Sequence, residues 1–201
     1  MKIIGVTGPS GSGKTLLTEY FSSLGISTID ADALYHSMLV PPSHCLDLIR
    51  EKFGDSVFFD DGSLNRAALS EIVFRSPEKL ELLNRTVLGT VIQEIRRIIS
   101  ELDQKGETVV IVDAPTLIES GFNQECDTVI SVISSPEIRV KRISERDGIS
   151  LQKAEARVSA QRDDEFYKNA SNHVLYNNAT TEDFLKSVIM LAEELGYKSN
   201  K

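Results

Sequence analysis

The sequence predicts an α/β fold built on a central, doubly wound parallel sheet, and two observations carry this prediction. Short β-branched runs alternate with longer segments in which apolar residues recur at helical spacing. The first of these runs breaks, within Ile3–Thr15 (IIGVTGPSGSGKT), into glycines and serines that lead directly into a helical pattern. A chain of 201 residues is long enough for one core with an insertion and short for two independent domains.

The glycine-rich stretch matches the pattern G-x-x-x-x-G-K-[ST], which is typical of a phosphate-binding loop, or P-loop. Gly8, Gly11 and Gly13 allow successive backbone N–H groups to turn toward a polyphosphate. Lys14 adds a positive charge for the β- and γ-phosphates, and the Thr15 hydroxyl is placed to ligate Mg²⁺ where the helix begins. The stretch therefore predicts a site for a nucleoside triphosphate with Mg²⁺.

The other elements follow in order along the chain. The predicted strands cover residues 3–6, 26–29, 109–112, 128–133 and 173–176. The predicted helices cover residues 16–24, a segment from about 34, 45–53, 63–74, 77–102, a segment from 136, and 181–195. Together they predict a P-loop NTPase fold, a three-layer sandwich around a five-stranded parallel sheet.

Acidic residues follow two of these strands. Asp30 and Asp32 follow the second strand, and Asp113 ends the third. Carboxyl ends of parallel strands line the edge at which α/β proteins bind ligands, so all three are site candidates. The alternative for Asp30 and Asp32 is capping of the helix that begins near Leu34. Asp113 either helps to hold the magnesium or is a cap or turn residue before Pro115.

Two helical segments are predicted to add to the sheet. Residues 34–105 are mostly helical and lie between the second and third strands, so we expect a substrate-binding insertion within one kinase domain. In the segment 139–165, Arg139, Arg142 and Arg146 are spaced by three and four residues and share one helix face. This segment is either a solvated helix or, beside a P-loop, a lid whose guanidinium groups cover the phosphates.

Composition excludes several classes of function. The formal net charge of −8 gives no overall field that would attract a nucleic acid. No long uncharged run and no secretory signal is present, so we expect no membrane partner and a cytoplasmic location. Cys45 and Cys126 belong to no paired motif, and we expect reduced thiols. Small molecules are the expected partners, and a monomer is favoured.

Six motifs together resemble the dephospho-CoA kinase family and run in its order across nearly the whole chain. They are TGPSGSGKT, LGISTIDAD, FGDSVFFDDGSLNRAALSEIVF, VVIVDAPTLIESGF, RVKRISERDGIS with EARVSAQ, and HVLYNN. The resemblance implies transfer of the γ-phosphoryl of ATP, with Mg²⁺, to the 3′-hydroxyl of dephospho-CoA, which is the last step of coenzyme A biosynthesis.

The resemblance also implies roles for particular residues. Asp32, the second acid of IDAD, would be the general base or orienting group at the acceptor hydroxyl, with Lys14 and Arg142 as the other catalytic residues. Phe53 and Arg66 match the motif of the CoA-binding region. Thr15 and Asp113 would hold the metal. The residues expected to bind ATP are Gly11, Ser12, Gly13, Lys14, Thr15, Leu16, Arg142 and Arg146.

The chain departs from the family pattern at two places that bear on the structure. Leu88 and Gly89 stand where the family usually has His-Pro, so we expect the long helix to lack its usual break. Arg139 stands where the family usually has Gln. The alternative function is that of a nucleoside kinase of the uridine type, because GPSGSGK also resembles that loop. A nucleotide-dependent switch is a weaker alternative, since no N-K-x-D motif is present.

Overall fold

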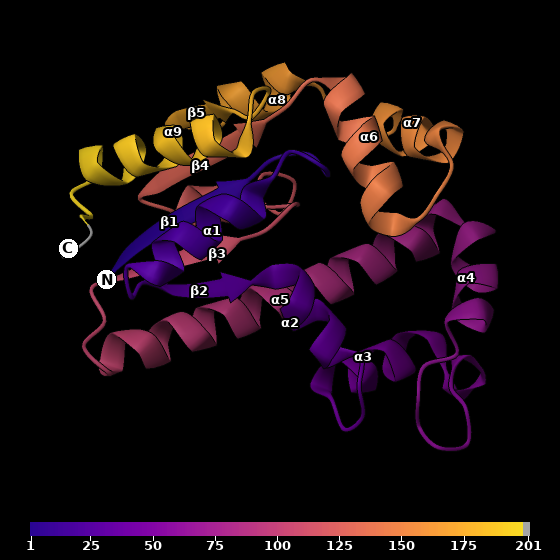
Figure 1. Cartoon of the computed structure of the whole chain (residues 1–201). Coiled ribbons are helices and arrows are strands. Elements are labelled where there is room, and N and C mark those ends of the chain that lie inside the picture. Colours follow the sequence, from indigo (N-terminus) through magenta and orange to yellow (C-terminus); the bar gives the residue numbers. More distant parts are fainter. Residues whose placement is uncertain (199–201) are drawn as a thin grey trace. The chain divides into compact units, whose positions relative to one another are not determined.

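The computed structural model describes residues 1–198 of the chain, which divide into two compact units (Figure 1). The first unit comprises Met1–Ile29 and the chain from Leu102 onward, and the second comprises Asp30–Glu101. The first unit holds the sheet. The second contains most of the predicted insertion over residues 34–105.

The first unit is built on a five-stranded sheet with the order β2-β3-β1-β4-β5. The strands are β1 (Lys2–Thr7), β2 (Ser27–Asp30), β3 (Val109–Asp113), β4 (Thr128–Ile133) and β5 (His173–Tyr176). Strand β1 pairs in parallel with β3 and β4, so that Val6 lies opposite both Asp113 and Ile130, and β4 pairs in parallel with β5. The predicted α/β sheet is confirmed, with the P-loop strand at its centre.

Helices α1 (Lys14–Ser23) and α9 (Thr181–Glu194) contact each other and share a core with the sheet. Leu17 and Phe21 of α1 and Phe184 of α9 are buried in one cluster with alternate residues of the inner strands. The segment after β3, which includes the 3₁₀ helix Phe122–Glu125, also packs on β1. Its Leu117 lies so close to Gly5 of β1 that a Cβ on this glycine would stand 2.6 Å from Leu117 Cδ2. The central strand is therefore buried by both apolar helices and this connection.

A helical pair follows β4. Helices α6 (Pro136–Asp147) and α7 (Leu151–Ser159) pack together around a small apolar core of Ile143, Ala154 and Val158 (Figure 1). These helices occupy most of the segment 139–165. The short helix α8 (Asp164–Asn169) comes next and was not predicted, because six polar-rich residues carry no measurable periodicity.

The second unit is helical. It contains α2 (Ala31–Met38), α3 (His44–Phe53), the 3₁₀ helix Asp55–Val57, α4 (Arg66–Phe74) and most of α5 (Pro77–Gln104). Its core includes Cys45, Ile49 and Leu69, and both Cys45 and Cys126 are free thiols as predicted. The prediction that a helix begins at Ser63 is wrong by three residues, because the Asn65 side chain caps α4 by accepting from the Ala68 amide.

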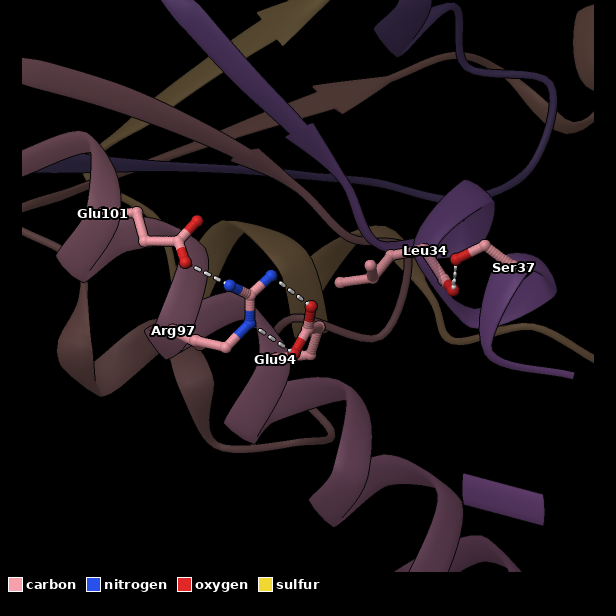
Figure 2. A network of polar contacts seen from close by, with 5 residues as sticks. All are labelled: Leu34, Ser37, Glu94, Arg97 and Glu101. Carbon is pink, nitrogen blue, oxygen red and sulfur yellow. Dashed lines mark hydrogen bonds and ion pairs between the residues drawn. The ribbon is translucent and has the colours of Figure 1, made fainter. Parts of the chain in front are cut away.

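Helix α5 runs through 28 residues without interruption, as expected from the absence of a His-Pro pair. On its exposed surface Arg97 pairs with Glu94, at 2.7 Å, and with Glu101, while nearby on α2 the Ser37 hydroxyl donates to the Leu34 carbonyl (Figure 2). Pairs one helical turn apart add modest stability. No helix within residues 1–198, including α5, is both long and apolar enough to cross a bilayer.

Candidate phosphate-binding site

The loop between β1 and α1 adopts a conformation that requires its glycines. Gly8, Gly11 and Gly13 have φ angles of 140°, 79° and 94°, which side chains with a Cβ rarely adopt. Space is limiting as well. A Cβ on Gly8 would lie 2.2 Å from the Val132 carbonyl oxygen, and one on Gly13 would lie 2.2 Å from Asn177 Nδ2. The loop is thus packed directly on the ends of the neighbouring strands.

The loop ends at the uncapped beginning of α1. Gly13 occupies the N-cap position and gives no side-chain cap, and the first turn of α1 contains no acidic residue. Side chains cap α2, α3, α4, α7, α8 and α9, whereas α6 also begins without a side-chain cap but has the acidic Glu137 in its first turn. An uncapped helix start presents backbone N–H groups and the positive end of the helix dipole to an anion. This terminus therefore fits a phosphate group.

Polar side chains of the loop add to this fit. Lys14 Nζ donates to the Gly8 carbonyl oxygen at 2.8 Å, which holds the ammonium group against the loop. The Ser12 hydroxyl is fully buried and has no hydrogen-bond partner among the described residues. A buried hydroxyl in that state costs about 1–3 kcal/mol, and native proteins keep such groups mainly at functional positions. Thr15 is exposed in the first turn of α1, whereas the Leu16 side chain packs on the core.

Asn177, directly after β5, connects the loop to two strands. Its Nδ2 donates to the Ser12 carbonyl oxygen at 2.8 Å, and its backbone N–H donates to the carbonyl oxygen of Ile133 at 2.8 Å. The buried Ser134 hydroxyl donates to the Asn177 carbonyl oxygen at 2.6 Å. Neither Asn177 nor Ser134 was predicted to be a site residue. Their position at the carboxyl ends of strands, the criterion applied to Asp113, was the signal that would have found them.

Arg142, from α6, reaches the same place. Its guanidinium donates to the carbonyl oxygens of Gly11 and Ser12 at 3.3 and 3.4 Å, to Ser134 Oγ at 3.0 Å and to Asn177 Oδ1 at 3.1 Å. Burial lowers the pKa of Arg142 below its usual value. The guanidinium nevertheless stays charged, because arginine has a very high pKa to begin with. The side chain therefore places a positive charge against the backbone of the P-loop.

Arg146 has a different environment. It forms a two-pronged pair with the carboxylate of Asp147, with nitrogen–oxygen distances of 2.7 and 3.1 Å, and its side chain is 60% exposed. Arg157 of α7 pairs with the same carboxylate. Hydrogen bonds from Arg146 hold the pKa of Asp147 below its usual value. The structure thus brings Arg142 to the loop and leaves Arg146 at the surface of the helical pair.

The predicted metal ligand Asp113 lies at the edge of the sheet from which the loop departs. It ends β3 opposite Val6, and the next two residues contact β1: the Ala114 amide donates to the Val6 carbonyl oxygen at 3.0 Å, and Thr7 Oγ1 donates to Pro115 at 3.3 Å. Carboxylate and hydroxyl oxygens are ligands that Mg²⁺ prefers, and this ion commonly takes its other ligands from substrate phosphates and water. Asp113 and Thr15 therefore fit a magnesium–nucleotide site.

The remaining candidates belong to the second unit. Asp30 Oδ1 accepts the amides of Asp32 and Ala33, each at 2.9 Å, so the capping alternative is confirmed for Asp30. Asp32 is exposed in the first turn of α2 and is not the residue that caps this helix. Phe53 packs on the core of this unit, and Arg66 is exposed at the first position of α4.

A glycine loop between a central strand and an uncapped helix, in a five-stranded α/β sheet, defines a P-loop kinase-like protein. Comparison with known proteins then specifies the family. The sequence model described as dephospho-CoA kinase matches residues 2–183. This chain therefore belongs to the dephospho-CoA kinase family.

Individual relatives agree with this assignment. The chain is 37% identical to the dephospho-CoA kinase of Dehalococcoides mccartyi, covering 96% of this chain and 98% of the relative, and 34% identical to that of Fusobacterium nucleatum with the same coverage. Among solved structures, TT1252 from Thermus thermophilus superposes with a TM-score of 0.77 at 30% identity, covering 96% of this chain and 97% of the other. The dephospho-CoA kinase from Campylobacter jejuni gives 0.70 at 27% identity, with 97% and 98% covered.

A shikimate kinase from Acinetobacter baumannii, at 16% identity and a TM-score of 0.56, covers 98% of this chain and 96% of the other. At that identity the likeness extends to the fold alone.

Proposed function

We propose that this chain transfers the γ-phosphoryl group of ATP to the 3′-hydroxyl of dephospho-CoA, which gives coenzyme A and ADP. The observation that carries the proposal is a P-loop held in place by Asn177 and Arg142, within a chain that matches the family over residues 2–183. In the reaction the acceptor oxygen forms a bond to the γ-phosphorus while the bond to the β–γ bridging oxygen breaks. The hydroxyl proton leaves the acceptor oxygen.

The donor half of the site is proposed to consist of the P-loop and its neighbours. The amides of Gly11 and of residues 13–16 hold the phosphates, while the Ser12 amide donates to the Pro9 carbonyl oxygen, and Lys14 moves its ammonium from the Gly8 carbonyl to the β- and γ-phosphates. Mg²⁺, when bound here, would neutralise part of the phosphate charge. Thr15 and Asp113 would supply oxygen ligands to that ion, and this arrangement needs no further protein carboxylate.

The acceptor half is proposed to depend on Asp32. Its carboxylate is exposed and, unlike Asp30, is not engaged as a helix cap, so it is available to accept the proton of the acceptor hydroxyl. In a loose transition state the proton leaves late, and the carboxylate then acts largely by orienting the hydroxyl. Arg66, exposed at the start of α4, and Phe53 are proposed to contact dephospho-CoA.

The two arginines of α6 are proposed to contribute charge to the ATP site in different ways. Arg142 already contacts the loop and would stabilise negative charge that builds up on the phosphates. Arg146 would have to exchange its partner Asp147 for a phosphate oxygen.

We also propose that the enzyme acts in the cytoplasm. Its substrates are proposed to be small molecules, since a net charge of −8 does not favour a nucleic acid partner.

The decisive experiment measures ADP formation from ATP and Mg²⁺ with and without dephospho-CoA. We expect ADP release above the ATP-only background, with a product that carries the new phosphate on the 3′ position of the ribose. Uridine serves as the comparison acceptor, because a nucleoside kinase is the nearest alternative. Turnover of uridine, with none of dephospho-CoA, would overturn the proposal.

A further inference from the structure

Arg139 is a buried charge beside the P-loop. It lies in the first half of α6 and is only 3% exposed. Arginine is seldom buried to this extent unless a counter-ion accompanies it, because removing a guanidinium from water is costly. The family resemblance gives Gln as the usual residue here, so this cost is a feature of the present chain.

The partners of Arg139 are neutral. Its Nε donates to the carbonyl oxygen of Ser10, in the P-loop, at 3.1 Å, and a terminal nitrogen donates to Gln161 Oε1 just beyond α7. No carboxylate of the described chain lies within ion-pair distance of the guanidinium. Burial lowers the pKa of Arg139, and Tyr167 and Asp164 only partly oppose that shift. The charge is therefore held by dipoles and lacks a paired anion.

The contact with Ser10 also fixes the direction of a backbone amide. In a trans peptide the C=O and the following N–H point in opposite directions. When Arg139 holds the Ser10 carbonyl, the Gly11 amide is turned to the other side of the loop. Arg142 holds the Ser12 carbonyl in the same manner. The Ser10 carbonyl thus faces a buried cation and the Ser12 carbonyl a half-buried one, and the amides that follow these carbonyls face away.

The loop has little room to adopt another position here. A Cβ on Gly11 would lie 3.0 Å from the Arg139 carbonyl oxygen and 3.2 Å from its Cα, so the loop packs directly on the α6 backbone. The Ser12 amide is already committed to the Pro9 carbonyl oxygen at 3.2 Å. That bond closes a turn over Pro9–Ser12, so the turn and the hydrogen bond from Arg139 together fix the orientation of the Ser10–Gly11 peptide.

We propose that Arg139 is a positioning residue for the nucleotide: it directs the Gly11 amide toward the triphosphate and places behind the loop a positive charge that the phosphates compensate. Gln161 holds the guanidinium in that position. The residue touches no reacting atom and acts through the loop. This inference rests on the proposed function only in taking ATP as the ligand, and it concerns binding of the donor and leaves the acceptor aside.

The proposal predicts effects that a purely structural arginine would not produce. Replacing Arg139 by Met removes the charge and keeps much of the volume, so the relief of desolvation offsets the lost hydrogen bonds, and the unfolding temperature without nucleotide stays near that of the wild type. Nucleotide affinity falls, because the charge and the directed amide are lost. A structural role would instead lower stability and impair both substrates alike.

The test uses the full chain and Mg·ATP without acceptor. Isothermal titration calorimetry should give a Kd at least about tenfold higher for Arg139→Met than for the wild type, with partial recovery in Arg139→Lys, which restores the charge and one donor. Lys141→Met is the matched control: it removes a positive charge from the same helix at a side chain that is 76% exposed, and its Kd should stay within about twofold of the wild type. In turnover, KM for ATP should rise while KM for dephospho-CoA does not.

The outcomes separate the two proposals. A wild-type Kd in Arg139→Met would overturn the positioning role, and so would equal rises in both KM values accompanied by a lower unfolding temperature. Arg139→Gln, which retains polar contacts without the charge, provides the same comparison if the Met variant does not fold. Failure of the wild-type protein to use dephospho-CoA, with Mg·ATP binding intact, would contradict the proposed function and leave this inference standing.

Discussion

Substitution of Gly13 by Ala should destabilise the first unit through two separable effects. The left-handed backbone, with φ 94°, costs an alanine about 1–2 kcal/mol. The new Cβ would also stand 2.2 Å from Asn177 Nδ2, so that side chain must move and give up its bonds to Ser12 and Arg142. The neutral bond is worth about 0.5–1.5 kcal/mol and the charged one about 1.5–3. The sum, about 3–6.5 kcal/mol, is a large share of the stability of a typical domain.

Gly25→Ala isolates the first effect. Gly25 has φ 82°, and an added Cβ would meet no atom within 4 Å, so only the backbone strain applies. Urea unfolding followed by circular dichroism should therefore show Gly13→Ala to be about 2–4.5 kcal/mol less stable than Gly25→Ala. In an Asn177→Ala background the clash partner is gone, and the cost of Gly13→Ala should fall to that of Gly25→Ala. An unchanged cost in that background would refute the reasoning.

Three further predictions follow from other sites. Asp32→Asn should lower kcat by about a hundredfold or more while the Kd for Mg·ATP, from calorimetry, stays near the wild-type value, and a normal kcat would remove Asp32 from the mechanism. A hydrogen bond from Arg97 lowers the pKa of Glu94 below 4.5 in the folded state, so this carboxylate contributes stability above that pH and loses it as the pH falls. The stability difference between wild type and Glu94→Gln, from urea unfolding, should accordingly shrink between pH 6 and pH 3, and a constant difference would contradict it. Gly89→Ala, at an exposed position inside α5 where an added Cβ meets no atom within 4 Å, should raise stability by about 0.5–1 kcal/mol, and a loss would argue against the uninterrupted helix.

The sequence predicted the structure best where a change in residue type marks the point at which a strand ends. Strands β4 and β5 begin and end at the predicted residues, because their apolar runs are bounded by polar or proline residues. The P-loop could be located from residue spacing, since its glycines are required by backbone conformation and close packing. The position of Asp113 at the end of a strand was predicted correctly, and its role toward magnesium stays a prediction.

Other parts of the site depend on contacts that residue types do not encode. Hydrogen bonds connect the P-loop backbone to three side chains, those of Asn177, Ser134 and Arg142, which also bond to one another. The partners lie up to 165 residues apart in the sequence. Every residue supplies a carbonyl oxygen, so a partner of that kind leaves no compositional signal. Capping by Asp30 was one of the two predicted alternatives. Only the hydrogen bonds that its carboxylate accepts from the amides of Asp32 and Ala33 show that Asp30, and not Asp32, caps the helix.

The arginines of α6 illustrate the limit of helical periodicity. Arg139 and Arg146 are seven residues apart and so lie on nearly the same side of the helix, yet one is buried against the loop and the other is exposed beside Asp147. The difference lies along the helix axis, because seven residues advance an α-helix by about 10 Å. Only the part of α6 nearest its beginning reaches the loop, and it carries Arg139 and Arg142. Under the proposed function, Arg139 and Arg142 would therefore hold their charges beside the P-loop without a movement of α6, whereas Arg146 would have to leave Asp147 to reach a phosphate.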